Sequence, residues 1–155
     1  MAEASLECRR VCPELRQSLA DFFAQVLASG DDRYFHPHPF TPEDAARLAQ
    51  YDGKDLYYVL IVGRQVLGYG ILRGWDEGYQ APSLGLIIHP AARGRGLARL
   101  IMLFLHAASR QRGAQKIRLK VYPHNQPARR LYESLGYEFG SEEQGHLVGV
   151  LRLPP

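Results

Sequence analysis

Apolar residues recur along the chain with two spacings, one typical of helices and the other typical of strands. Between residues 97 and 112 they follow the i, i+3, i+4 rule of an amphipathic helix, which Gly113 ends. Residues 115–123 instead alternate between apolar and polar positions, as in a strand that is buried on one face. The same reasoning predicts further strands over 4–11, 56–63, 65–74, 83–90 and, as a pair, within 137–154, and a helix over 12–29. Capping residues predict two more helices, one directly after Thr41, which Pro42 and Asp44 follow, and one over 125–135, between Asn125 and Gly136.

This order of elements predicts one mixed α/β (α+β) domain spanning residues 1–155, a length typical of a single domain. Hydrophobic residues make up 46% of the chain and charged residues 23%, which is ordinary for a globular protein. No apolar run approaches the roughly 20 residues needed to span a bilayer, and the first residues lack the order of a secretory signal. We therefore expect a cytoplasmic protein with no membrane contact.

Charge, cysteine and histidine content argue against nucleic-acid binding, a disulfide scaffold and a metal site. A formal net charge of +3, spread along the chain, is not the footprint of a nucleic-acid-binding protein. Cys8 and Cys12 have no further ligands at zinc-site spacing, and a chain of this length does not need a disulfide scaffold. His36 and His38 form a His-x-His pair without a third ligand. We therefore expect no metal, and ordinary roles for both cysteines.

Residues 93–98, "RGRGLA", place two glycines and two arginines at the start of the predicted helix. The first amides of a helix have no internal partners and carry partial positive charge, so such a turn binds anions. The spacing excludes a P-loop, which needs a lysine and a hydroxyl after its last glycine, and the dinucleotide fingerprint, which needs three spaced glycines. The alternative is a tight strand-to-helix turn with exposed arginines.

The segment 87–102, "IIHPAARGRGLARLIM", resembles the acetyl-CoA-binding segment of the GNAT superfamily of N-acetyltransferases. Arg93, Gly96 and Ala98 match its pattern of Arg or Gln, two residues, Gly, one residue, then Gly or Ala. The resemblance implies a central, mostly antiparallel sheet with a splayed pair of parallel strands, flanked by helices. It also implies acetyl-CoA as co-substrate, with its pyrophosphate on the amides of the turn and its pantetheine arm beside the preceding strand.

The segment 125–140, "NQPARRLYESLGYEFG", resembles the following motif of the same family. The resemblance implies that Tyr132 is the general acid that protonates the departing thiolate, a task that suits a phenol protonated at neutral pH. The alternative is a core role, because apolar residues share its helix face. The resemblance implies a cofactor-binding set of Ile87, Ile88, Arg93, Gly94, Arg95, Gly96, Leu97, Ala98, Asn125 and Tyr132.

The general base is less defined. Many relatives carry a glutamate on the strand before the glycine-rich turn, but here the strand 83–90, "SLGLIIHP", has no carboxylate. Glu77 and Asp76 are the nearest acids in the chain, and His89 ends the strand with a reference pKa near 6.5. Loss of the proton to solvent, with no base, stays open.

The loop 33–44, "RYFHPHPFTPED", is expected to form a rigid, partly aromatic wall for the acceptor amine. Together with residues 68–85 it is similar to acetyltransferases of bacterial amino-sugar and surface-polysaccharide pathways. This similarity implies a nucleotide-linked amino sugar as acceptor, a small-molecule amine. The residues expected to bind it are His36, His38, Asp76 and Glu77.

The sequence leaves open the acceptor, the presence of turnover, nucleic-acid binding and the oligomeric state. The acceptor could be an aminoglycoside, a polyamine or a protein N-terminus, although few acidic clusters are present to attract polycations. The domain could also hold acyl-CoA as a sensor, without turnover. Nucleic-acid binding would rest only on the arginines near residues 93–99 and 110–130. A homodimer through an exposed sheet edge is possible in principle, but the sequence does not decide it.

Overall fold

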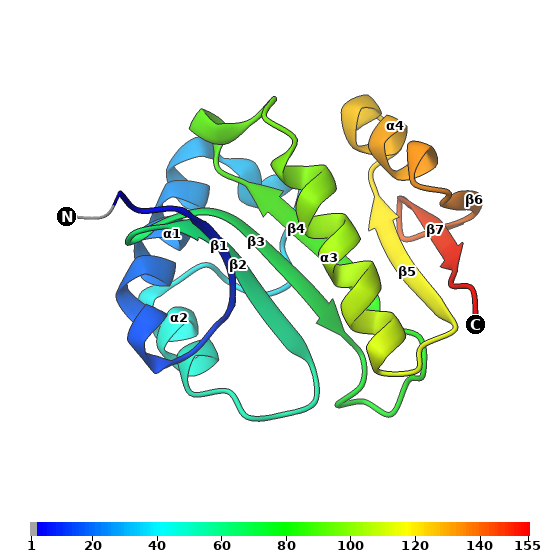
Figure 1. Ribbon diagram of the computed structural model, residues 1–155. Helices are drawn as coiled ribbons and strands as arrows, with labels where there is room; N and C mark the ends of the chain where they lie inside the picture. Colours follow the sequence, from blue (N-terminus) through cyan, green and yellow to red (C-terminus); the bar gives the residue numbers. More distant parts are fainter. Residues whose placement is uncertain (1–2) are drawn as a thin grey trace.

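The computed structural model describes residues 3–155, which form a seven-stranded sheet with helices on both faces (Figure 1). Every predicted helix and strand is present. The strands are β1 (Leu6–Arg10), β2 (Leu56–Val62), β3 (Gln65–Arg73), β4 (Ser83–Ile88), β5 (Lys116–Val121), β6 (Glu138–Glu143) and β7 (His146–Arg152). The helices are α1 (Arg16–Ser29), α2 (Pro42–Ala49), α3 (Leu97–Gln111) and α4 (Gln126–Ser134), with short 3-10 turns at Pro13–Leu15, Asp31–Arg33 and Pro90–Ala92. Within this described part, no helix is both long and apolar enough to cross a bilayer.

The strands are ordered β1-β2-β3-β4-β5-β7-β6, and only β4 and β5 run parallel. β4 pairs with β3 over six positions, but it pairs with β5 at one position alone, Ser83 opposite Arg118. Next to that position the N–H of Arg118 donates to the carbonyl of Pro82 at 2.9 Å. Beyond it the two strands diverge, so the β5-facing edge of β4 lacks a strand partner. The mostly antiparallel sheet with one splayed parallel pair, implied by the family resemblance, is confirmed.

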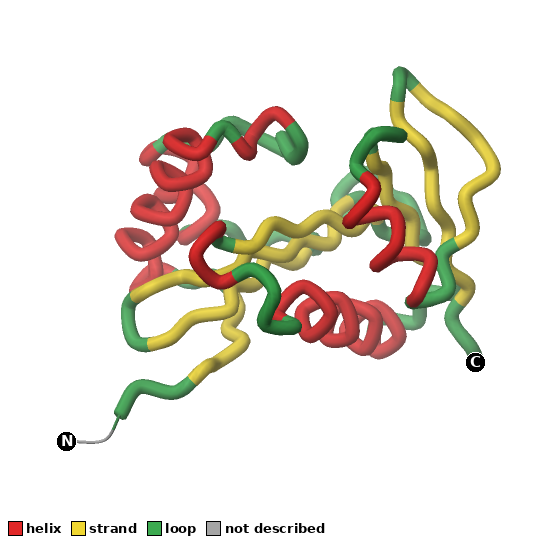
Figure 2. The backbone as a smooth tube through the Cα atoms, turned by 90° about the horizontal axis from the view of Figure 1, so that it is seen from above, coloured by secondary structure: helices red, strands yellow, loops and turns green. Residues whose placement is uncertain are grey.

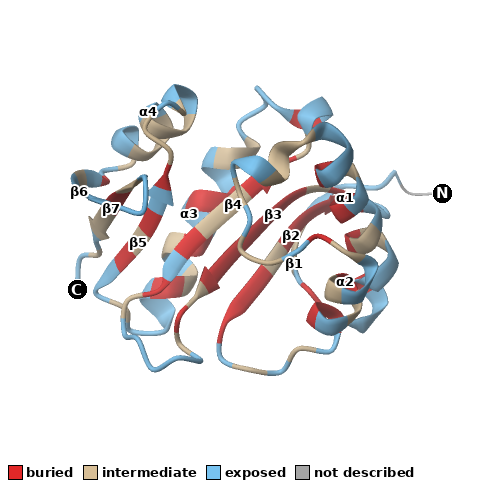
Figure 3. Cartoon of the chain, turned by 180° about the vertical axis from the view of Figure 1, so that it is seen from behind, coloured by how far each residue is buried: buried red, intermediate tan, exposed pale blue. Residues whose placement is uncertain are grey.

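The helices divide between the two faces of the sheet (Figure 2). α1 and α2 pack over β2 and β3, in a core that contains Phe23 and Tyr69. α3 and α4 lie on the opposite face, over a second core that contains Ile101 and Leu119. Buried residues are concentrated along β2 and β3, between the two layers (Figure 3).

His38, expected from the sequence to bind the acceptor, is half-buried and packs against the core beside α1. Its ring centroid is 5.3 Å from that of Phe23 and 5.0 Å from that of Phe40. Nδ1 lies 2.7 Å from the carbonyl oxygen of Pro39, which can only accept, so Nδ1 carries the proton and Nε2 accepts from the Tyr69 hydroxyl at 2.8 Å. His38 does not line the cavity described below, and we correct its assignment to that of a half-buried structural residue.

Two half-buried histidines are expected to make the stability depend on pH. Burial lowers the pKa of both His38 and His106, and each ring shares a 2.8 Å hydrogen bond with a tyrosine hydroxyl. Because the unfolded chain binds these protons more readily, we expect the free energy of unfolding to fall as pH drops below about 6.5. Urea unfolding at pH 7.5, 6.5 and 5.5 measures this. In the double variant His38→Gln/His106→Gln, the free energy of unfolding should depend less steeply on pH than in the wild type. An equal pH dependence in the variant and the wild type would show that these two histidines are not its cause.

Candidate active site

A cavity of about 1170 Å³ lies where β4 and β5 diverge. The whole of β4, residues 83–88, forms one wall, and the turn 92–99 closes one end, although Arg95 does not line it. α4 contributes to the opposite wall, and the loop 34–37 reaches the cavity from the α1 side. The cavity therefore passes through the sheet and joins its two faces.

The glycine-rich turn leaves the N-terminus of α3 open to this cavity. Gly94 and Gly96 have φ of 76° and 82°, a left-handed conformation that favours glycine. The first helical hydrogen bond runs from the N–H of Leu100 to Gly96, so the amides of residues 97–99 have no partner within the helix. No side chain caps this end of the helix. The arrangement offers a cluster of backbone donors to an anion.

Arg93 connects this turn to the other face of the sheet. Its Nη2 lies 2.6 Å from the carboxylate of Asp31, and its Nε donates to the carbonyl of Ile88 at 3.3 Å. Both Arg93 and Asp31 line the cavity. Asp31 was not predicted, because it lies 62 residues before Arg93 and nothing in the pattern relates the two.

Tyr132 lies on α4, across the cavity from β4. Its side chain packs against the core beneath α3 and also lines the cavity, so both roles considered from the sequence are compatible with its position. Burial raises the pKa of Tyr132 to about 12, which keeps the phenol protonated. Asn125 caps α4 by accepting from the N–H of Ala128 at 3.4 Å, and it lines the same wall.

Of the three base candidates, the structure brings only Glu77 to the cavity. His89 accepts from the N–H of Ala91 at 3.1 Å and caps a 3-10 turn outside it. Asp76 accepts from the Tyr51 hydroxyl and from the N–H of Lys54, and these bonds hold its pKa below its usual value. Its carboxylate is thus committed to the turn rather than to the cavity.

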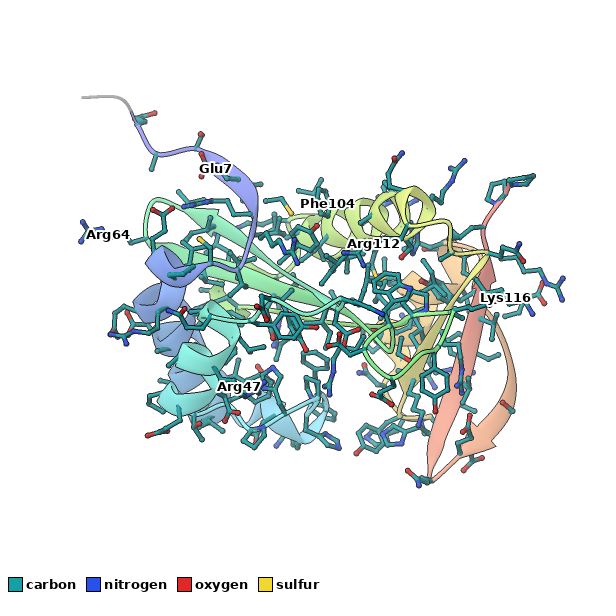
Figure 4. All side chains as sticks on the ribbon, turned by 90° about the horizontal axis from the view of Figure 1, so that it is seen from below. Glu7, Arg47, Arg64, Phe104, Arg112 and Lys116 are labelled. Carbon is teal, nitrogen blue, oxygen red and sulfur yellow. The ribbon has the colours of Figure 1, made fainter. Side chains whose placement is uncertain are left out.

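The turn that carries Glu77 is fixed by hydrogen bonds and by packing against Arg112. The buried carboxylate of Asp55 accepts from the N–H groups of Gly74 and Trp75 at 3.0 and 2.9 Å. Arg112, at the end of α3 (Figure 4), lies over the Trp75 ring at 4.9 Å and donates to the carbonyl of Lys54 at 2.6 Å. Glu77 is therefore presented at the cavity by a fixed turn.

The α1 side of the cavity contains groups that the sequence did not single out. His36, which the sequence places in the acceptor wall, lines it together with His124 and His146. The rings of His36 and His146 lie 6.4 and 4.2 Å from that of Tyr122. His124 and His146 lie far from His36 in the chain, so no local spacing could have grouped them with it. Across residues 3–155, no three His, Cys, Asp or Glu side chains are arranged to hold a metal ion.

Comparisons with known proteins agree with this architecture. The model of the acetyltransferase (GNAT) family matches residues 15–137. An acetyltransferase of Sodalis glossinidius is 36% identical over 95 residues, which are 61% of this chain and 65% of that protein.

Two solved structures share the fold. The GNAT domain of S. lividans PAT has a TM-score of 0.80 at 18% identity, covering 98% of this chain and 96% of that one. An N-acetyltransferase of Thermoplasma acidophilum, in complex with coenzyme A, has a TM-score of 0.73 at 14% identity, covering 96% and 99%. The chain belongs to the GNAT acetyltransferase family.

Proposed function

We propose that the chain is a single-domain acetyl-CoA-dependent N-acetyltransferase that acetylates a primary amine of a small molecule. One observation carries the proposal: a single cavity joins the open N-terminus of α3 to the Tyr132 side chain along the unpaired edge of β4. An anion-binding end, a free strand edge and a proton donor are what an acyl thioester of coenzyme A requires. Use of acetyl-CoA also favours a cytoplasmic enzyme.

The pyrophosphate of coenzyme A is assigned to the turn 93–98 and the amides of residues 97–99. Left-handed glycines keep side chains away from the approaching phosphates, and Arg93 and Arg99 line the same end of the cavity. The pantetheine arm is assigned to the free edge of β4, where the backbone N–H of Ile88 can hydrogen-bond it as a strand would. The backbone of Ile87 faces β3 instead, because the N–H of His89, two residues later, donates to the carbonyl of Leu67. Binding far from the thioester then positions the reacting carbonyl.

The reaction follows from these positions. The neutral amine attacks the thioester carbonyl, the new C–N bond forms, and a backbone N–H of β4 stabilises the oxyanion. As the C–S bond breaks, Tyr132 protonates the departing thiolate. The proton that the amine loses passes to Glu77 through water or directly to solvent. With His89 and Asp76 outside the cavity, Glu77 is the proposed base among the three candidates.

The acceptor enters from the α1 side, where His36 and Glu77 line the cavity. A nucleotide-linked amino sugar is the first acceptor to test, because the aromatic and histidine rings offer stacking surfaces for a base and sugar. Aminoglycosides, polyamines and protein N-termini are the competing acceptors. Retention of acyl-CoA without turnover, as in a sensor, is the competing function.

The direct test measures thiol release from acetyl-CoA with purified protein and a panel of amines that includes nucleotide-linked amino sugars. We expect turnover with one acceptor class, together with acetyl-CoA binding measured by calorimetry. Tight binding without turnover on any amine would favour the sensor. Absence of binding would rule out the assignment of residues 93–98.

The substitution Gly96→Ala should weaken acetyl-CoA binding by about 10-fold, because the left-handed backbone costs alanine about 1–2 kcal/mol and the turn relaxes away from it. Calorimetric titration measures the dissociation constant. Gly113→Ala is the matched control: it has the same left-handed φ, 81°, and equally open surroundings, at the other end of α3. Equal losses of affinity in the two variants would show that the effect comes from general destabilisation.

The substitution Tyr132→Phe should lower kcat on the order of 100-fold and leave acetyl-CoA affinity nearly unchanged, since only the acid proton is removed. Steady-state kinetics and calorimetry separate the two quantities. Tyr137→Phe is the control, because that buried tyrosine lies 5.9 Å from the Tyr132 ring but bonds His106 rather than lining the cavity. Unchanged turnover in Tyr132→Phe would remove this residue from the mechanism.

A further inference from the structure

The α1 side of the cavity contains a cation that the proposed mechanism leaves unused. Arg73 is the last residue of β3, paired in register with Ser83 at the start of β4, and its side chain lines the cavity. The guanidinium therefore lies near the point where β4 and β5 begin to diverge, on the side from which an acceptor enters.

Arg73 has a fixed position but no counter-ion. Its Nη1 donates to the carbonyl of Pro37, which ties it to the acceptor loop. Among residues 3–155, none of the ion pairs within 4.0 Å includes it. A partly buried guanidinium is stabilised by a charged partner, and its remaining N–H groups are free to bind one. The described part of the chain supplies no such partner.

The other charges on this side do not neutralise it. Of the two carboxylates that line the cavity, Asp31 is paired with Arg93, which leaves Glu77 alone. Lys120, on β5, lines the opposite wall and adds a second cation without an ion-pair partner. By contrast Arg118, two residues earlier on the same face of β5, is paired with Glu143 at 2.7 Å and lies outside the cavity.

We propose that the acceptor carries an anionic group, a carboxylate or a phosphate, in addition to its amine, and that Arg73 is the residue that binds this group. The inference rests on the proposed acetyl transfer and adds the chemical class of its acceptor. The guanidinium forms paired hydrogen bonds to either anion, and Lys120 adds a point charge from across the cavity. The same two cations repel polyamines and aminoglycosides, which carry only positive groups.

The test compares acceptors in pairs that differ only in the anion. Glucosamine 1-phosphate is compared with glucosamine, and phenylalanine with phenylalanine amide, so that the two pairs distinguish a phosphate from a carboxylate. Thiol release from acetyl-CoA gives kcat and KM for each compound with the wild-type protein, Arg73→Gln and Arg73→Lys. Arg118→Gln is the matched control, an arginine of the same sheet face that is outside the cavity.

We expect the wild-type protein to prefer the anionic member of at least one pair by 10-fold or more in kcat/KM. Arg73→Gln should lose about 10- to 100-fold on that compound, mainly through KM, and lose little on its neutral partner. Arg73→Lys should recover part of the loss, and the KM for acetyl-CoA should stay constant. Arg118→Gln should behave as the wild type.

Equal use of both members of each pair by the wild-type protein would overturn the inference and leave the acetyltransferase proposal standing. Equal losses on the anionic and the neutral member in Arg73→Gln would also overturn it, because they would indicate a structural role. If the protein binds acetyl-CoA but acetylates no compound of either pair and no other amine, the proposed function and this inference fail together.

Discussion

Ser83 and Arg118 form the only pairing between β4 and β5, and the rest of the site depends on it. A second or third pair would close the sheet and fill the cavity with backbone. Instead both strands stay bound on their outer edges, β4 to β3 and β5 to β7, while their C-terminal ends diverge. Because α3 follows β4 and α4 follows β5, the divergence carries the N-terminus of α3 and the Tyr132 side chain to opposite walls of one cavity.

The cavity gives the two faces of the sheet different roles. Under the proposed function, the cofactor is bound by the turn before α3 and by α4, while the acceptor is bound by the loop after α1 and by the strands β5 and β7. The Asp31–Arg93 ion pair is a direct connection between the two, since one partner lies beside the acceptor loop and the other begins the glycine-rich turn. Under the proposed function, a shift of Arg93 toward the pyrophosphate would therefore also pull on Asp31, just before the proposed acceptor loop.

The longer elements could be predicted from hydrophobic periodicity, and α2 and α4 from their caps at Thr41 and Asn125; most elements end close to glycine or proline. Site residues were harder to predict, since side-chain direction depends on distant partners. His38 is bound by Tyr69, 31 residues later, and Asp76 by Tyr51, 25 residues earlier. His146 meets Tyr122 only because β7 pairs with β5, and one sequence does not encode that pairing locally.

The missing carboxylate on β4 and the unpaired cation at Arg73 are related under the proposed chemistry. An acceptor amine must lose its proton before it attacks, and a nearby positive charge favours the neutral form by lowering the pKa of the amine. Arg73 and Lys120 line the side of the cavity that the amine enters, while one unpaired carboxylate, Glu77, opposes them. Two cations and one unpaired carboxylate favour the neutral amine of the acceptor. Such a site needs a weaker base than a site in which a carboxylate stabilises the protonated amine. In the proposed complex the acceptor's anion pairs with Arg73, so the effect on the amine comes from Lys120 and from the absence of an acidic side chain on β4.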